Sequence, residues 1–280
     1  MDDAELLRYS RQIMLPELDV AGQERLLAAR VLVVGLGGLG SPAALYLAAA
    51  GVGSLLLSDD DHVDVSNLQR QILHGEADVD RAKTDSARDR LLALNPRVDI
   101  ETLACRLEGA ALADAVAGVD LVVDGTDNLA TRYAINRACL DHGRPWVSAA
   151  AIRFEAQLTC FDPRHSDSPC YRCLWPDAEE LELNCAENGV IAPLVGVVGA
   201  LQALEAVKLL AGIGEPLVGR ILTFDALTGR WQDFRLKRRP DCADCGLPPG
   251  SGVTPIATPA TRTQAPIVPR WRGARRTCPR

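Results

Sequence analysis

The hydrophobic pattern is clearest at residues 31–34, where four aliphatic residues run together with no polar position between them. Such a run suits a parallel β-strand that is covered on both faces. It leads into Gly35-x-Gly37-x-x-Gly40 and then into an apolar helix, which Gly51 is placed to end in a left-handed conformation. The stretch therefore predicts a strand, a tight turn and a helix in succession.

Similar apolar runs alternate with helical patterns along the first half of the chain. Further strands are expected at 54–58, 98–103, 120–124 and 146–150, and helices at 83–95, 108–117 and 129–142. The second half has short β segments at 158–161, 220–226 and 230–236 and one helix near 197–211. We therefore expect an α/β fold, a Rossmann-like doubly wound and mostly parallel sheet with an antiparallel C-terminal extension.

The N-terminal segment has a helical pattern over 5–13 and again over 22–30. Arg8 and Arg11 are three residues apart, so a continuous helix would place them on one face. From this spacing alone, a solvated basic face is the favoured interpretation.

The glycine turn indicates phosphate binding, because a helix that begins behind such a turn presents free N–H groups and a positive dipole end. Asp59 follows the next strand, about 20 residues past the turn, where nucleotide-binding folds place a ribose-binding acid. Glycine patterns also occur where a helix and a strand merely pack closely, but Asp59 favours a nucleotide. ATP and NAD both carry a ribose and phosphates, so these residues do not distinguish them.

Two polar stretches supply further candidates. The loop at 61–83 contains Asn67, Arg70 and Gln71 and ends near Lys83. The turn at 124–128 follows a predicted strand, and open α/β sheets bind ligands at that carboxyl edge.

Attack on the α-phosphate of a nucleotide mainly requires positioned cations and Mg²⁺. Arg11, Arg70 and Lys83 are candidate cations, and Asp127 is a candidate Mg²⁺ ligand. From spacing alone, each could equally be a surface charge.

Composition narrows the class of protein. The 280-residue chain has a formal net charge of −7, which argues against a general nucleic-acid binder. From Gly246 onward it has six arginines and no acid, and we expect residues 247–280, which include Cys278, to form a disordered basic tail.

The N-terminus shows no apolar signal region, which points to the cytoplasm. The apolar stretch at 190–210 is interpreted as a buried amphipathic helix rather than a membrane span, because Gln202, Glu205 and Lys208 form a polar stripe on it.

Two CxxC pairs, at Cys170 and Cys173 and at Cys242 and Cys245, are a strong metal-binding signal. Each pair supplies two thiolates, so together they complete a closed tetrahedral zinc site with no open position for catalysis. Closing so long a loop costs roughly 4 kcal/mol of chain entropy, whereas structural zinc contributes about 10 kcal/mol or more. The alternatives are a redox-active pair or two unrelated pairs.

Several motifs together resemble a known family. They are SRQI, GLGGLG, the Asp59 region, SNLQRQ, the DGTDN turn, CYRCLWPD, the segment beginning GVIAPLVGVVG and the terminal CADCG, and they extend from about Leu6 to Gly246. In order and spacing they resemble the MoeB and ThiF adenylyltransferases, which activate sulfur-carrier proteins and are related to ubiquitin-activating enzymes. NAD dehydrogenases share only the glycine turn and its acid.

The resemblance implies that ATP lies over Gly38 and the glycine turn, and that the C-terminal Gly-Gly carboxylate of a ubiquitin-fold carrier attacks its α-phosphate. The products would be an acyl-adenylate and pyrophosphate. By this resemblance, Asp59 holds the ribose and Asp127 binds Mg²⁺. The remaining nucleotide-binding positions are Gly35, Gly37, Gly40, Ser66, Asn67, Arg70, Lys83 and Asn128.

The resemblance also implies a homodimer in which Arg11 reaches the partner subunit's ATP site, and this replaces the solvated-face interpretation. Cys185 aligns with a cysteine that the thiamine-branch enzymes link covalently to the carrier; the alternative is a free loop cysteine, as in the molybdopterin branch. One departure is Gly125, where many relatives have cysteine. Because Asp127 remains, we expect Mg²⁺ binding to persist.

We therefore predict an adenylation domain at 1–246, with a nucleotide-binding half at about 1–150 and a carrier-binding and zinc half at about 151–246. No sulfurtransferase domain follows the second CxxC pair, so the sulfur donor would be a separate protein. An NAD(P)-binding oxidoreductase is the alternative from another class, but it leaves SNLQRQ and the cysteine pairs unexplained. A non-catalytic scaffold for ubiquitin-fold proteins is disfavoured, because Lys83 and Asp127 are present. The sequence does not decide between a MoaD-type and a ThiS-type carrier.

Overall fold

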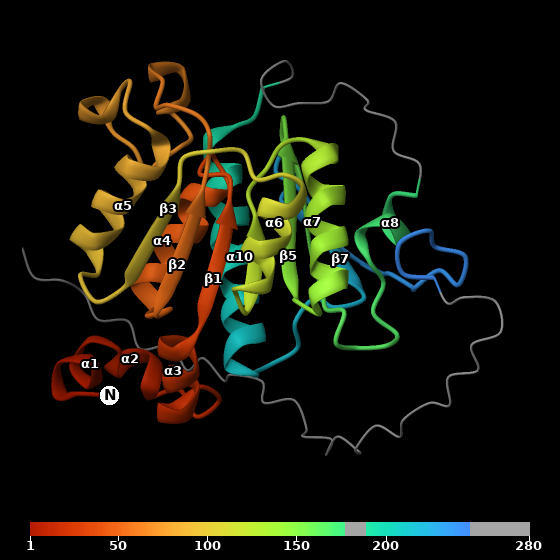
Figure 1. The fold of residues 1–280 in the computed structure, drawn as a ribbon, viewed down its shortest axis with the longest axis horizontal. Helices are drawn as coiled ribbons and strands as arrows, with labels where there is room; N and C mark the ends of the chain where they lie inside the picture. Colours follow the sequence, from red (N-terminus) through yellow and green to blue (C-terminus); the bar gives the residue numbers. More distant parts are fainter. Residues whose placement is uncertain (177–188, 247–280) are drawn as a thin grey trace, which may run out of the picture. The chain divides into compact units, whose positions relative to one another are not determined.

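The computed structural model describes residues 1–176 and 189–246, and the predicted tail at 247–280 lies outside this part. Its centre is an eight-stranded sheet with the order β3-β2-β1-β4-β5-β6-β7-β8 (Figure 1). The first five strands are parallel, and β6, β7 and β8 are antiparallel. The strands are β1 (Arg30–Val34), β2 (Ser54–Ser58), β3 (Asp99–Leu103), β4 (Leu121–Asp124), β5 (Trp146–Ile152), β6 (Glu155–Phe161), β7 (Arg220–Asp225) and β8 (Arg230–Arg235).

Helices cover both faces of the sheet, as a doubly wound fold requires. One face packs against α4 (Gly40–Ala50), α5 (Lys83–Leu94) and α10 (Ala192–Ala211). The opposite face packs against α6 (Gly109–Ala117), α7 (Leu129–His142) and the short α8 (Tyr171–Leu174). In β1, Val31 and Val33 join the first core and Leu32 joins the second. The predicted Rossmann-like sheet with an antiparallel extension is confirmed, and its continuous apolar strand is buried on both faces.

The first helix after the glycine turn also follows the sequence prediction. The helix α4 ends at Gly51, whose φ of 87° lies in the left-handed region. A side chain there would clash with Tyr9 and Gln23, which lie within 2.7 Å of the position of a Cβ atom. Glycine is therefore required at this helix end both by conformation and by space.

The predicted N-terminal helix over 5–13 is wrong in one respect. It is two short helices, α1 (Asp3–Arg8) and α2 (Ser10–Ile13), which are followed by α3 (Asp19–Ala28). The break occurs at Tyr9, whose side chain is buried and whose hydroxyl oxygen accepts a hydrogen bond from Asn95 Nδ2 at 3.0 Å. Arg8 and Arg11 therefore do not share the face of one helix.

The helix α10 begins at Ala192, five residues earlier than predicted. By length and apolar composition it could cross a membrane, yet half of that stretch is buried within the protein, as predicted for a core helix. Its polar stripe points inward rather than to solvent. Gln202 Nε2 donates to the Asp124 carbonyl at 2.7 Å, and Glu205 accepts the Leu217 N–H at 2.8 Å. The outer face of α10 instead exposes the apolar side chains of Val197 and Leu204.

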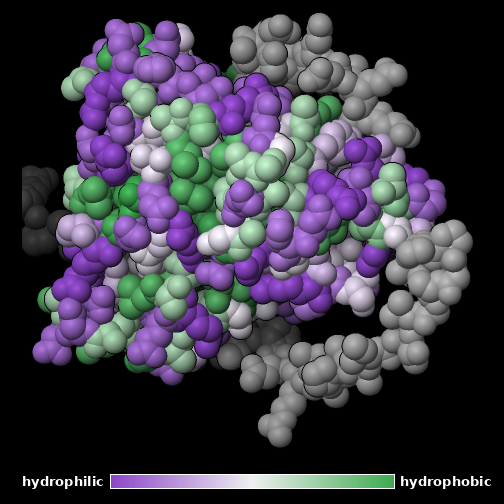
Figure 2. Space-filling model, viewed as in Figure 1, coloured by the Kyte–Doolittle hydropathy of each residue, from purple (hydrophilic) through white to green (hydrophobic). Residues whose placement is uncertain are grey.

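Figure 2 shows apolar residues gathered left of centre on the face viewed, in front of the strands β1 and β2, with hydrophilic residues around them. The long polar loop between β2 and α5 contains two single-turn helices, η1 (Val65–Asn67) and η2 (Glu76–Asp78). This loop belongs to the carboxyl edge of the sheet, where the candidate site lies.

Candidate nucleotide site and four-cysteine cluster

Three connecting segments meet at the carboxyl edge of the parallel sheet. They are the glycine turn after β1, the loop after β2 and the turn after β4. The strands β1 and β4 are paired with Val34 opposite Asp124, so the turns that follow them lie side by side. Their backbones are in direct contact, because a Cβ atom on Gly35 would lie 2.9 Å from the Gly125 carbonyl oxygen.

The glycine turn is held through the backbone of one residue, Leu36. Asp59 Oδ2 accepts the Leu36 N–H at 2.7 Å. The Leu36 carbonyl lies 3.1 Å from His74 Nε2, and it accepts a hydrogen bond from Ser41 Oγ at 3.1 Å. A carbonyl can only accept, so His74 carries its proton on Nε2. Burial lowers the pKa of His74, which keeps this ring neutral.

The turn leaves no room for side chains at the position where α4 begins. A Cβ atom on Gly40 would lie 1.9 Å from the Gly35 carbonyl oxygen. Gly38 faces Val195 of α10, whose Cγ2 atom would be 3.1 Å from an added Cβ atom. Ser41 and Ala43 already donate their N–H groups to the Gly37 and Leu39 carbonyls. Within the described residues, the N–H groups of the turn at 37–40 make no hydrogen bond, so these are the groups that an anion could approach.

Asp59 lies at the end of β2 and is half-buried. Its Oδ1 atom accepts the Asp61 N–H at 2.8 Å, so each carboxylate oxygen already has one backbone donor. Two lone-pair positions remain, which suits the paired hydroxyls of a ribose. Burial raises the pKa of Asp59 above its ordinary value, although Lys83 and the two N–H groups act in the opposite direction.

The predicted cations Arg70 and Lys83 both belong to the loop after β2 and to the start of α5. Arg70 Nη2 donates to Asn67 Oδ1 at 2.8 Å, and its Nη1 contacts the Ser66 carbonyl at 3.3 Å. Lys83 is buried, and its Nζ atom donates to the exposed Asp61 carboxylate at 2.8 Å. Each cation is therefore oriented by an oxygen that a phosphate oxygen could replace.

The turn after β4 is ordered by buried groups. Asp124 Oδ1 accepts the Thr126 N–H at 2.9 Å and the Thr126 hydroxyl at 2.6 Å. Asn128 caps α7, since its Oδ1 atom accepts the Thr131 N–H at 2.9 Å. Asp127 is exposed, and within the described part of the chain its carboxylate makes no hydrogen bond or ion pair.

Arg11 lies away from these three segments. Its neighbour Gln12 donates to the carbonyl of Ala50, at the end of α4 opposite the glycine turn, at 2.9 Å. A helix of 11 residues is about 16 Å long, so Arg11 and the glycine turn of one chain are at opposite ends of α4. The structure therefore does not bring Arg11 to the other predicted site residues of its own chain, and Cys185 lies outside the described residues.

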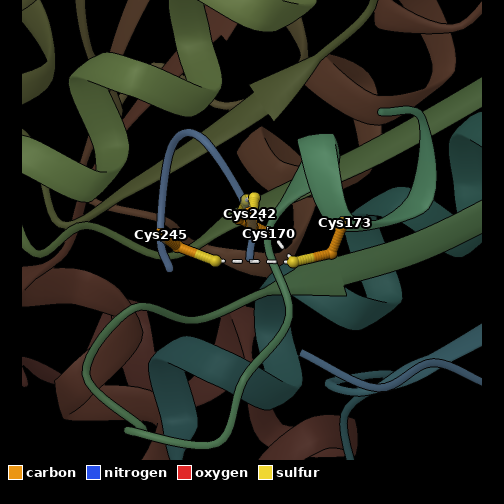
Figure 3. Close-up of side chains that lie close together, drawn as sticks. All are labelled: Cys170, Cys173, Cys242 and Cys245. Carbon is orange, nitrogen blue, oxygen red and sulfur yellow. Dashed lines mark hydrogen bonds between the residues drawn. The ribbon is translucent and has the colours of Figure 1, made fainter. Parts of the chain in front are cut away.

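The four predicted metal ligands do meet, as Figure 3 shows. Sulfur–sulfur distances are 3.9 Å between Cys170 and Cys173, 3.6 Å between Cys170 and Cys242, and 3.4 Å between Cys173 and Cys245. A tetrahedral zinc ion with Zn–S bonds of about 2.3 Å requires sulfur atoms about 3.8 Å apart. The donor set and its spacing therefore fit one metal ion.

The surroundings of the cluster also fit a metal site. The Arg239 N–H points at the Cys173 sulfur at 3.3 Å, which orients a thiolate. Behind the second pair, Gly246 donates its N–H to the Cys242 carbonyl at 2.8 Å, and a Cβ atom there would lie 2.4 Å from that oxygen. A tight turn of this kind requires glycine directly after the second CxxC pair.

Three residues that order the site were not predicted to do so from the sequence. His74 gave no signal beyond its place in a polar loop. Gln202 did carry a signal in the sequence, because a glutamine in the most apolar helix needs a buried hydrogen-bond partner. Arg132 did as well, because it follows the start of α7, where the helix dipole disfavours a cation.

The fold and these sites define a nucleotide-binding α/β protein whose C-terminal extension contributes to a four-cysteine cluster. The chain belongs to the ThiF family, whose model matches residues 9–244. It is 50% identical to the Sulfur carrier protein ThiS adenylyltransferase of Escherichia coli over 91% of this chain and 100% of that protein. It is also 50% identical to the Molybdopterin-synthase adenylyltransferase of Salmonella typhimurium, over 88% of this chain and 98% of that protein.

Solved structures with the same fold include that of Escherichia coli MccB with ATP. It matches with a TM-score of 0.75 at 25% identity and covers 86% of this chain and 75% of that one. The family membership and the fold class predicted from the sequence are thus confirmed, whereas the roles of individual site residues stay predictions.

Proposed function

We propose that the chain is an ATP-dependent adenylyltransferase that activates the C-terminal glycine of a ubiquitin-fold sulfur carrier. The observation that carries this proposal is the meeting of three segments at one sheet edge. They combine N–H groups of the glycine turn at 37–40, the cations Arg70 and Lys83, and the exposed carboxylate of Asp127, which has no hydrogen bond or ion pair within the described residues. Two adenylyltransferases at 50% identity, matched over nearly their whole lengths, support it.

The reaction needs little acid–base chemistry. The carrier carboxylate is ionised at pH 7 and attacks the α-phosphorus of ATP, forming a new P–O bond. The bond from the α-phosphorus to the bridging oxygen breaks, and pyrophosphate leaves with the electron pair. No proton is transferred, so the protein contributes by orienting the reactants and stabilising negative charge.

Nucleotide binding follows from the contacts described above. Asp59 accepts the ribose hydroxyls with its free lone pairs, while Gly38 lies below the nucleotide. Lys83 has two donors left beyond its bond to Asp61, and Arg70 can exchange its neutral oxygen partners for phosphate oxygens. Ser66, Asn67 and Asn128 are assigned here as supports of these contacts.

Asp127 is the residue that would hold Mg²⁺. One exposed carboxylate suits this ion, which keeps several waters and takes its other ligands from substrate phosphates. When bound, Mg²⁺ neutralises charge on the polyphosphate.

The cysteine cluster would hold a structural Zn²⁺. Because all four positions of a tetrahedral ion are filled by sulfur, its role is to tie the segment after β8 to the start of α8. This site would stabilise the extension without entering the reaction.

We further propose a homodimer in which Arg11 acts in the partner subunit's site. Arg11 is exposed and lies near the end of α4 that is opposite the glycine turn of its own chain. Apolar side chains beside it are open to a second copy, since Leu7 is 78% exposed and Met14 is 69% exposed. In a symmetric dimer, such a face contacts its own equivalent.

Complementation tests this arrangement. Arg11→Ala and Asp127→Ala subunits should each be inactive alone. After mixing, half of the dimers are mixed and each has one complete site, so about a quarter of the original activity should return. If native mass spectrometry shows mixed dimers but activity does not return, Arg11 does not act in trans.

The carrier-binding half at 151–246 stays a proposal. It is supported by β8, an edge strand whose six residues are all exposed, including Trp231 and Phe234. An edge strand with aromatic side chains can accept a small β-rich protein. Cys185 keeps its two interpretations, a covalent link to the carrier or a free loop cysteine. We place the enzyme in the cytoplasm and assign sulfur donation to a separate protein.

The decisive assay is ATP–pyrophosphate exchange with a MoaD-type and a ThiS-type carrier added separately. Exchange with one carrier, lost in Asp127→Ala, would support the reaction and name the carrier class. Binding of a nicotinamide nucleotide together with no exchange for either carrier would favour the oxidoreductase alternative and overturn the proposal.

A further inference from the structure

Arg132 is a buried cation beside the carboxyl edge of the sheet, where the candidate nucleotide site lies. Its side chain lies in the first turns of α7 and is only 9% exposed. Arginine is almost never this buried unless its charge and donors are satisfied. Its Nη2 atom donates to the Thr126 carbonyl at 2.5 Å and to the Ala149 carbonyl at 3.2 Å, and its Nε atom lies 3.3 Å from Asp124 Oδ2.

These contacts keep the guanidinium charged. Burial alone would disfavour the cation, but the carboxylate of Asp124, the hydroxyl of Tyr171 and the carboxylate of Asp127 outweigh it and hold the pKa of Arg132 above its ordinary value. Arg132 thus brings a permanent positive charge to the turn after β4. Asp124, which is fully buried, is the counter-charge.

The turn itself is held at almost every residue. Thr126 is fixed by Asp124 through its N–H and hydroxyl, and by Arg132 through its carbonyl. Gln202 holds the Asp124 carbonyl from α10. Among residues 124–128, the side chain of Asp127 stands out because it has no hydrogen bond or ion pair within the described residues. A rigid frame around one free carboxylate is the arrangement that precise ion binding requires.

We propose that Arg132 is a positioning residue for adenylation, which fixes the peptide between Thr126 and Asp127 and thereby aims the Asp127 carboxylate at the Mg²⁺–ATP complex. The inference rests on the proposed function and extends it to a residue that does not touch the substrate. Arg132 acts through the backbone and through its charge, because its Nη2 atom donates to two protein carbonyls and its buried Nε atom lies in an ion pair with Asp124 without a hydrogen bond.

The test compares three variants in ATP–pyrophosphate exchange at increasing Mg²⁺ concentration. Arg132→Met keeps the length of the side chain but removes its donors and charge. Arg137→Met is the matched control, because Arg137 lies on the same helix in an exposed pair with Asp141. Thr126→Val removes only the hydroxyl bond to Asp124 and leaves the arginine in place.

We expect Arg132→Met to raise the Mg²⁺ concentration for half-maximal exchange roughly tenfold, with partial recovery at high Mg²⁺, because one strong buried contact no longer holds the turn. Thr126→Val should shift it in the same direction by less, and Arg137→Met should not shift it. A purely structural role would lower thermal stability and leave the Mg²⁺ dependence of the folded enzyme unchanged.

An unchanged Mg²⁺ dependence in an active Arg132→Met enzyme would overturn the inference. If Arg132→Met does not fold, an unshifted Thr126→Val would overturn it instead. Absence of exchange in the unmodified enzyme is a separate outcome, since it counts against the adenylyltransferase proposal itself.

Discussion

Replacement of Gly40 by alanine tests the nucleotide site most directly, because the predicted clash is with backbone. The added Cβ atom would lie 1.9 Å from the Gly35 carbonyl oxygen, and real Cβ atoms essentially never come within 3.0 Å of such an atom. The glycine turn must therefore move by about 1.1 Å or more. No side-chain rotation can relieve the contact.

The size of the effect follows from this displacement. A shift of about 1 Å in a group that orients substrate costs on the order of 100-fold in rate, or about 2.7 kcal/mol of transition-state stabilisation. We therefore expect kcat/KM for ATP in pyrophosphate exchange to fall about 100-fold in Gly40→Ala. Circular dichroism would verify that the variant remains folded.

A second glycine provides the control. Gly196 lies within α10, and no atom comes within 4 Å of the position of its Cβ atom. Alanine is favoured over glycine in a helix by about 1 kcal/mol, so Gly196→Ala should leave the exchange rate unchanged and raise thermal stability slightly. If Gly40→Ala loses less than about threefold, the glycine turn does not approach the nucleotide as we propose.

Three further predictions concern metal, pH and the glycine turn. Cys245→Ser should abolish the zinc content measured by elemental analysis and lower the melting temperature, whereas Cys105→Ser, at an exposed free cysteine, should do neither; equal zinc in both would refute the cluster. Because burial raises the pKa of Asp59, ATP affinity measured by calorimetry should weaken on acidification at a higher pH than an ordinary aspartate would predict, and Asp59→Asn should remove that acid limb. His74→Leu removes the donor to the Leu36 carbonyl and should raise KM for ATP roughly threefold to tenfold. A rise in KM no larger than that of an exposed-surface control such as Arg137→Met would contradict a role for this hydrogen bond.

Most of the fold could be predicted because each element carried its own local signal. The strand at 31–34 is apolar at every position, and Gly51 marks the helix end that the structure has. The break at Tyr9 could not be predicted, because it depends on Asn95, which is distant in sequence and supplies the hydrogen bond to its hydroxyl. At Tyr9, burial of the side chain in the tertiary structure outweighed the local helical pattern.

The site was predictable where function constrains spacing. The meeting of the two cysteine pairs could be predicted, because the residue type and the spacing within each pair suit one tetrahedral metal ion. The partners of the supporting groups were not predictable, since the contact of Arg132 with Thr126 depends on how α7 is placed against the turn. The burial of α10 was predicted, but the partners of its polar stripe were not, because Gln202 and Glu205 bond to groups on other elements.

The direct backbone contact between Gly35 and Gly125 limits which segments can be exchanged between related proteins in a chimera. A Cβ atom on Gly125 would lie 2.7 Å from the Gly35 carbonyl oxygen, so any residue with a side chain at this position would require a wider gap between the two turns. Each turn is therefore fitted to the other. A chimera with a crossover between these positions would join unmatched halves, whereas one that inherits residues 31–125 from a single parent would keep them matched.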